Sequence, residues 1–145
     1  MTDTKRIINT RRFFEKYLDR LLSVAGRNRV DLLPNNLKQL HTSPESFPTH
    51  IRYAEQLTQL VGQAISTCQD QPRKPYRRIL IYSYLEEVNN YESERRLGYS
   101  SSRYGELKHL ALNEFTDRFN TLAIRAGVEP AVSLINTTKS YKTCK

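Results

Sequence analysis

The sequence has no tryptophan, two cysteines, five glycines and no long apolar run among its 145 residues. Cys68 and Cys144 stand alone without the spacing of a metal site, and two cysteines do not suggest a disulfide scaffold, so we expect free thiols in a reducing cytoplasm. No stretch approaches the roughly 20 apolar residues that span a bilayer. The basic start, MTDTKRIINTRRFF, lacks the apolar stretch of a secretory signal, so neither a membrane segment nor a signal is expected.

Catalytic and metal-binding patterns are also missing from the sequence. The histidines, His41, His50 and His109, are scattered, and no nucleophile has a base at a suitable spacing. There is no glycine-rich phosphate loop, and the Glu86–Glu87 pair is better explained as a solvated helix end than as a metal site. The protein is therefore not expected to be an enzyme, and no metal or other cofactor is predicted.

What the sequence has in excess is positive charge, with 23 lysines and arginines against 15 aspartates and glutamates and a formal net charge of +8. The basic residues gather in residues 1 to 30 and again between residues 73 and 108. Such a balance favours a polyanionic partner, which is either nucleic acid or an anionic membrane surface. A membrane-surface helix at residues 7 to 25 is the weaker alternative, because core packing or dimerisation explains its apolar face better.

Apolar spacing predicts three helices in the first two thirds of the chain. Residues 7 to 25 and 49 to 68 have apolar side chains three and four residues apart, with Thr49 as the expected cap of the second helix. The stretch between them is rich in proline and turn formers, which predicts a loop with one short helical turn around residues 35 to 40. Residues 76 to 88 are predicted as the third helix, with a strand as the alternative because β-branched and aromatic residues are dense.

The pattern after the third helix indicates a helix-turn-helix. The Asn89–Asn90 pair forms a turn and cap, and the short helix YESERRL ends at Gly98, where a left-handed residue is needed. Leu97 and Tyr99 are the expected apolar anchors on either side of this glycine. Ser100 caps a long helix that runs to about residue 127. A helix, a short helix, a tight turn and a long helix are the layout of a helix-turn-helix.

Three consecutive serines stand at the start of the long helix, although serine is a weak helix former and one cap is sufficient. Helical spacing places Tyr104, Leu107 and Ala111 on the stripe that faces the core. The opposite face then carries Ser101, Ser102, Gly105, Glu106 and His109. A recognition helix reads base edges with its N-terminal residues, and small hydroxyl side chains enter the major groove without clash. A frayed capping region is the alternative explanation of the serines.

The segment YSYLEEVNNYESERRLGYSSSRYGELKHLALNEF resembles region 4 of bacterial sigma factors and, more closely, the phage transcriptional regulators of the ArpU and RinA type. The N-terminal RRFFEKYLDRLLSVAG is also similar to the start of ArpU-type proteins. The resemblance covers about two thirds of the chain. It implies sequence-specific binding of double-stranded DNA in the bacterial host cytoplasm and activation of phage late packaging and lysis genes.

The resemblance also implies roles for individual residues. The positions that contact bases in region 4 correspond to Ser101, Ser102, Gly105 and Glu106. Two departures from the family pattern stand out. Ser93 and Glu94 replace an isoleucine and an alanine that pack the short helix, and Gly105 and Glu106 replace longer basic or amide side chains. Direct reading of bases by this helix is therefore expected to be sparse, which leaves more of the binding to phosphate contacts.

Basic residues around the long helix are the candidate phosphate contacts. They are Arg73, Lys74, Arg77, Arg78, Arg95, Arg96, Arg103 and Lys108. A solvated charged surface is the alternative for each of them taken singly. Double-stranded DNA is the predicted partner, with host RNA polymerase and a second copy of the chain as further candidates.

The sequence thus predicts an all-α protein with a C-terminal helix-turn-helix like sigma region 4. The expected organisation is an N-terminal helical region at residues 1–71 (helix 7–25, loop 26–48, helix 49–68), a DNA-binding domain at 72–127 and a flexible tail at 128–145. The predicted function is a transcriptional regulator. A phage small terminase subunit, which also uses a helix-turn-helix but assembles into rings, and an adaptor that binds RNA polymerase are the alternatives.

Overall fold

The computed structural model describes residues 6–137, and this part of the chain is mostly helical with one small two-stranded sheet. The helical elements, in chain order, are α1 (Thr10–Arg12), the π-helical turn η1 (Phe13–Tyr17), α2 (Leu18–Ala25), the 3-10 turn η2 (Arg29–Leu32), α3 (Pro34–Leu37), α4 (Thr49–Thr67), α5 (Tyr76–Leu80), the π-helical turn η3 (Ile81–Leu85), α6 (Asn90–Leu97) and α7 (Ser101–Ala126). The strands are β1 (Arg6–Asn9) and β2 (Val132–Ile135). No helix among the described residues is long and apolar enough to cross a membrane.

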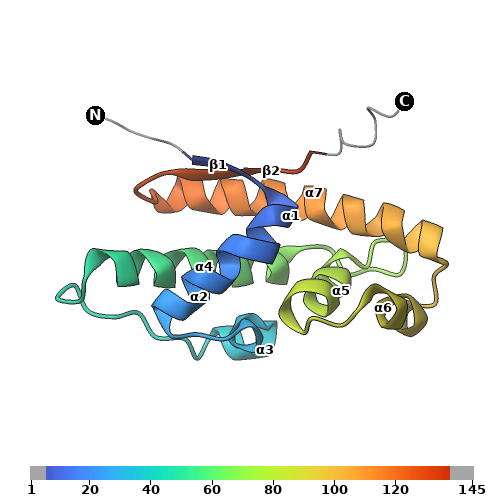
Figure 1. The fold of residues 1–145 in the computed structure, drawn as a ribbon, viewed down its shortest axis with the longest axis horizontal. Helices are drawn as coiled ribbons and strands as arrows, with labels where there is room; N and C mark the ends of the chain where they lie inside the picture. Colours follow the sequence, from blue (N-terminus) through green and yellow to red (C-terminus); the bar gives the residue numbers. More distant parts are fainter. Residues whose placement is uncertain (1–5, 138–145) are drawn as a thin grey trace.

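The two long helices, α4 and α7, lie side by side and run in opposite directions (Figure 1). The first helical segment, α1 to α2, crosses them and packs mainly on α4. At one end of the molecule α5 and α6 lie beside the first turns of α7, and toward the other end the sheet lies along its last turns (Figure 1). α7 therefore contacts elements from both ends of the chain.

An aromatic cluster fills the place where the first helical segment meets α7. The Phe14 ring stacks on Tyr84 with centroids 4.2 Å apart and planes 7° apart, and it lies 4.6 Å from the ring of Phe115. Phe13 and Phe119 extend the cluster, with ring centroids 5.7 Å apart. Each of these side chains is almost fully removed from water. Burying large aromatic rings in such geometry is a major source of stability, so the cluster joins three distant segments of the chain.

The sheet corrects three predictions. β1 pairs in parallel with β2, with Arg6 opposite Val132 and Ile8 opposite Leu134. The predicted helix at residues 7–25 therefore begins three residues later, at Thr10, after Asn9 accepts a capping hydrogen bond from the backbone N–H of Arg12. The predicted tail at 128–145 is wrong where Val132–Ile135 form β2, and residues 138–145, with Cys144, lie outside the described residues. The all-α prediction is right for the helices but missed the sheet.

The far edge of β2 is closed by a side chain of α7. Asn120 donates a hydrogen bond of 2.9 Å to the carbonyl of Leu134 and accepts one of 2.8 Å from the N–H of the same residue. A further buried hydrogen bond of 2.6 Å joins the hydroxyls of Thr10 and Thr116. Buried backbone groups need such partners, because an unpaired one is costly. These contacts explain why the short sheet stays on α7.

The other predicted elements are close to the observed ones. The helix at 49–68 is confirmed as α4, but Pro48 occupies the cap position and Thr49 is the first helical residue. The helix at 76–88 ends at Leu85, and its strand alternative is wrong. The expected turn around residues 35 to 40 is α3. Buried side chains from both sides of residue 71 belong to one cluster, and the boundary between the proposed domains stays a prediction.

We expect Phe14→Ala to lower the free energy of unfolding by about 3–5 kcal/mol, because it leaves a cavity beside two aromatic neighbours. Phe47→Ala is the matched control, since Phe47 is 45% exposed in the loop before α4. Its effect should stay within about 0.5 kcal/mol. Urea denaturation followed by circular dichroism measures both variants. Equal effects of the two substitutions would show that the cluster does not hold the helices together.

Candidate nucleic-acid interface

Two helices joined by a tight turn form one end of the molecule (Figure 1). α6 begins after Asn89, whose side chain accepts a hydrogen bond of 2.8 Å from the N–H of Glu92. It ends at Gly98, which has a φ of 78°, in the left-handed region that glycine adopts without strain. α7 begins after Ser100, whose Oγ accepts a hydrogen bond of 3.1 Å from the N–H of Arg103. The predicted caps and the glycine stop are confirmed.

The turn is anchored to the core and to a neighbouring loop. Leu97 and Tyr99 are partly buried against the core, as expected for the two anchors. The Tyr99 hydroxyl also donates a hydrogen bond of 2.7 Å to the carbonyl of Pro72. Pro72 belongs to a tight hairpin in which Gln71 and Lys74 exchange backbone hydrogen bonds of 3.1 and 2.9 Å. The turn and the tip of this hairpin are therefore held next to each other.

The faces of α7 are as the spacing predicts. The core-facing residues Tyr104, Leu107 and Ala111 are at most 1% exposed. The predicted base-reading residues, Ser101, Ser102, Gly105 and Glu106, are all exposed, and they lie together on the first two turns. A Cβ added at Gly105 would meet no atom within 4 Å, so packing does not require glycine there. Glycine nevertheless destabilises a helix interior by about 1 kcal/mol relative to alanine.

The three serines have three different environments. Ser100 is the cap. The Ser101 hydroxyl donates a hydrogen bond of 2.8 Å to a carboxylate oxygen of Glu94, which connects α7 to α6. Ser102 makes no side-chain hydrogen bond within residues 6–137, so its hydroxyl is available to a partner. Fraying does not explain this run, because each of the first two serines has a defined structural contact.

Ser93 is the buried polar residue of α6. The side chain is fully buried at the position where the resemblance places an isoleucine, and its hydroxyl has no hydrogen-bond partner among the described residues. Burying an unpaired hydroxyl is unfavourable. α6 nevertheless spans the predicted residues, with Asn89 as its cap and Gly98 as its stop.

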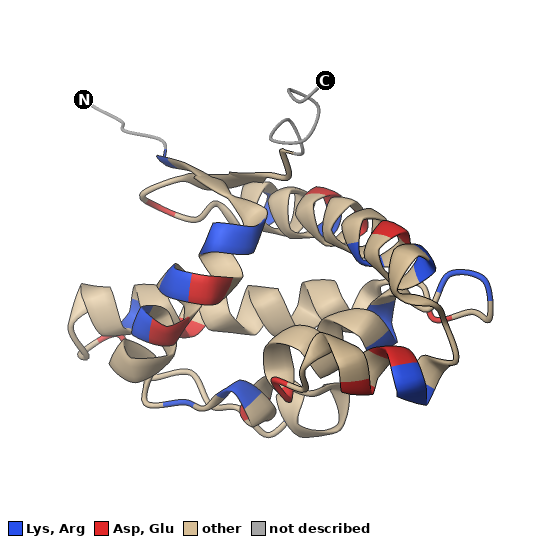
Figure 2. Ribbon diagram, turned by 45° about the vertical axis from the view of Figure 1, so that its right-hand side comes forward, with Lys and Arg blue, Asp and Glu red and all other residues tan. Residues whose placement is uncertain are grey.

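Most of the predicted phosphate contacts are already paired with acidic side chains. The pairs, at N–O distances between 2.7 and 4.0 Å, are Arg77–Asp70, Arg78–Asp70, Arg95–Glu92, Arg96–Glu92, Arg96–Glu86 and Arg103–Glu106. Hydrogen bonds from Arg95 and Arg96 hold the pKa of Glu92 below its ordinary value, so this carboxylate is charged at neutral pH. Basic and acidic segments accordingly lie close together at this end of the molecule (Figure 2). Pairing within the protein reduces the positive charge that these arginines present.

The hairpin is different. Arg73 and Lys74 are exposed, and within residues 6–137 neither forms an ion pair. Figure 2 shows the basic hairpin projecting beside the start of α7. Because the Tyr99 hydroxyl holds Pro72, this unneutralised charge is fixed close to the turn between α6 and α7.

Lys108 is the one predicted phosphate contact that the structure turns inward. It is only partly exposed, its Nζ donates a hydrogen bond of 3.0 Å to the side chain of Asn90, and the same nitrogen lies 5.3 Å from the centre of the Tyr84 ring. Burial lowers the pKa of Lys108, and the charge of Arg11 acts in the same direction, while Glu15 opposes the shift. Lys108 thus serves packing, and we leave it out of the candidate interface.

Sequence reasoning missed the contact between the turn and the hairpin. Its signal was the pair of prolines, Pro72 and Pro75, which enclose Arg73 and Lys74 and predict a sharp turn. Nothing in the sequence indicates the hydrogen bond from the Tyr99 hydroxyl, because the pattern predicts only an apolar anchor at this position.

Cys68 is buried, and burial raises the pKa of its thiol to about 12, so it is a structural residue. No three potential metal ligands gather among residues 6–137.

We expect Ser100→Ala to lower the free energy of unfolding by about 1 kcal/mol, because the first turn of α7 loses its cap. Ser102→Ala is the matched control two residues away, and its effect should lie within about 0.5 kcal/mol. Thermal and urea denaturation measure both. A larger loss for the Ser102 variant would contradict the assignment of Ser102 to the solvent-facing side.

The candidate interface at this end of the molecule is identified from its geometry and chemistry alone. A comparison of the chain with known protein families, curated proteins and solved structures gives no match. The candidate interface is thus the exposed start of α7 together with the basic hairpin at Gln71–Lys74.

Proposed function

We propose that the protein is a sequence-specific double-stranded DNA-binding transcriptional regulator in which α6, the turn at Gly98 and α7 act as a helix-turn-helix. The observation that carries the proposal is the position of an exposed, capped helix start beside an unpaired basic hairpin. Recognition helices present their first turns to base edges, and neighbouring cations bind phosphates. Both parts lie at the same end of the molecule, joined by the hydrogen bond from Tyr99 to Pro72.

The exposed residues of α7 suit the major groove. The groove is about 12 Å wide and admits an α-helix. Ser102 and Gly105 add little bulk, so the helix backbone can approach the bases closely. Packing within the protein does not require a glycine at position 105, since alanine would fit the free protein and stabilise the helix. Close approach to a partner is a reason for glycine there. The positive end of the helix dipole is also favourable near phosphate.

The pair between Arg103 and Glu106 is suited to exchange partners on binding. Its atoms are 2.9 Å apart, and both side chains are at least half exposed. An exposed ion pair contributes only about 0–1 kcal/mol, so it opens easily. A phosphate can then take Arg103, which leaves Glu106 free to accept a hydrogen bond from cytosine N4. The arginines paired with Asp70 and Glu92 have to leave their carboxylates in the same way.

The finer assignment rests on the resemblance to ArpU- and RinA-type regulators. It comprises activation of phage late genes in the host cytoplasm, with RNA polymerase and a second copy of the chain as candidate partners. Footprinting on the DNA of the phage that encodes the protein tests this part. Protection of a promoter upstream of packaging or lysis genes supports it, whereas protection of a packaging site by a ring of subunits supports a small terminase subunit instead.

Neutralising the hairpin with Arg73→Gln and Lys74→Gln should weaken binding to all DNA sequences. Each lost phosphate contact reduces the slope of log K against log salt by about 0.9, so the double variant should lose up to about 2. Fluorescence anisotropy at several salt concentrations measures the slope.

The matched control for the hairpin removes two charges elsewhere. Lys38 follows α3 and Arg125 lies in the last turn of α7, and both are exposed. Lys38→Gln with Arg125→Gln changes the net charge equally and should leave most of the slope in place. Identical slopes for the two double variants would mean that general charge, rather than the hairpin, carries the binding.

Ser102→Ala and Glu106→Ala should change which DNA sequence is preferred, while the helix content stays the same. Each lost base contact should alter discrimination by about 1–3 kcal/mol at one base pair. Binding-site selection with the two variants and the parent protein measures the preference. Recovery of the parental site with parental discrimination would show that the start of α7 does not read the bases.

A further inference from the structure

A groove between the sheet, α2 and α4 lies at the other end of the protein from the candidate interface. It has a volume of about 510 Å³, within the range of about 300–1,000 Å³ that is usual for small-molecule sites. Arg6 and Val132 contribute the inner face of the sheet, Leu21 and Val24 contribute α2, and Leu57 contributes α4. Leu21 and Val24 are only partly buried, so the chain leaves an apolar face of α2 incompletely covered.

The charge around this groove has one sign. Its charged lining residues are Arg6 and Arg20, with His50 beside them, and no aspartate or glutamate lines it. Neither arginine forms an ion pair within residues 6–137, in contrast to the paired arginines of α5 to α7. An arginine left without a carboxylate beside an apolar surface is suited to an anion that brings its own apolar part.

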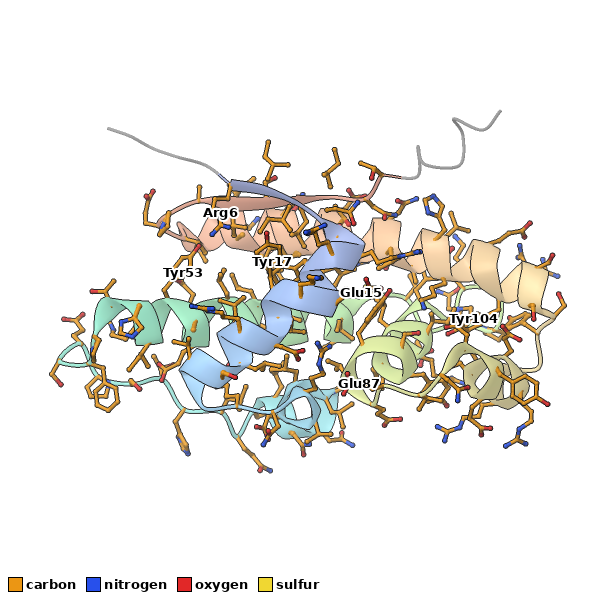
Figure 3. The ribbon with its side chains drawn as sticks, in the orientation of Figure 1. Arg6, Glu15, Tyr17, Tyr53, Glu87 and Tyr104 are labelled. Atoms are coloured by element: carbon orange, nitrogen blue, oxygen red, sulfur yellow. The ribbon has the colours of Figure 1, made fainter. Side chains whose placement is uncertain are left out.

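Two tyrosines, Tyr17 and Tyr53, line the groove near Arg6. The guanidinium of Arg6 lies 5.8 Å from the centre of the Tyr17 ring, and the Tyr53 hydroxyl donates a hydrogen bond of 2.8 Å to the carbonyl of Pro130. Figure 3 shows Arg6, Tyr17 and Tyr53 gathered between the sheet, the first helical segment and α4. The pKa of Tyr53 is raised, mainly because its hydroxyl is partly buried. The positive charge of Arg6 opposes this shift, and the negative charge of Glu129, which does not line the groove, adds to it. The contact with Tyr17 places the Arg6 guanidinium at the lining of the groove.

We propose that this groove binds a small amphipathic carboxylate, whose charged group pairs with Arg6 and Arg20 and whose apolar body lies on Leu21, Val24 and Leu57. A free phosphate or acetate would leave the apolar lining uncovered, and a neutral hydrocarbon would leave both guanidinium groups beside it without a counter-charge. The proposal does not depend on DNA binding.

Titration calorimetry with octanoate, octanol and acetate, on the full chain without DNA, tests the proposal. Octanoate should bind to one site per chain, and octanol and acetate should each bind at least about tenfold more weakly, since each lacks one of the two interactions. Methyl signals of Leu21, Val24, Leu57 and Val132 should shift with octanoate in NMR spectra. Failure of octanoate to bind, or equal binding of octanol, overturns the proposal.

The variants Arg20→Gln and Arg12→Gln test whether an arginine of the groove binds the carboxylate. Both residues are exposed arginines of the first helical segment, but only Arg20 lines the groove. Arg20→Gln should weaken octanoate about tenfold and leave octanol unchanged, while Arg12→Gln should bind octanoate like the parent protein. Equal weakening by both variants, or by neither, would refute the assignment of the groove. DNA binding can fail or succeed without affecting any of these results.

Discussion

The packing of Phe14 between Tyr84 and Phe115 is the contact on which the rest of the structure depends. Centroid distances of 4.2 and 4.6 Å place one ring against η3 and against α7 at once. Through it the first helical segment fixes where α5 and η3 lie relative to α7. The position of α6 follows, because only a short connection separates it from η3. The geometry of the candidate interface therefore has its origin in an aromatic core some distance from it.

Pairing of charges within the protein determines which basic residues are available to a partner. A net charge of +8 predicts a polyanionic partner, but five of the arginines near α7 are paired with the carboxylates of Asp70, Glu86, Glu92 and Glu106, which offset most of their charge. Arg73 and Lys74, which form no ion pair in the described part of the chain, lie on a hairpin that a tyrosine holds beside the turn. Exposed ion pairs are weak, so the paired arginines can leave their carboxylates and bind a stronger anion. Sequence-specific contacts with bases and sequence-independent attraction to phosphates would then involve different residues.

α7 connects the two ends of the protein. Its first turns carry the exposed serines, and its last turns hold β2 through Asn120. The sheet in turn places Arg6 in the lining of the groove between the sheet, α2 and α4. A single helix of 26 residues thus supports both the proposed DNA interface and the proposed carboxylate site. Its burial against α4 and α5 makes it a rigid support for both.

The sequence by itself determined the local features of this protein. Caps at Asn89 and Ser100, the stop at Gly98 and the core stripe of α7 depend on residues a few positions apart, and those predictions are confirmed. Only the tertiary structure decided the pairing of β1 with β2, the inward turn of Lys108 and the contact between Tyr99 and Pro72. These features depend on partners distant in the sequence, whose approach is set by packing of the whole core and leaves no periodic signal in either segment.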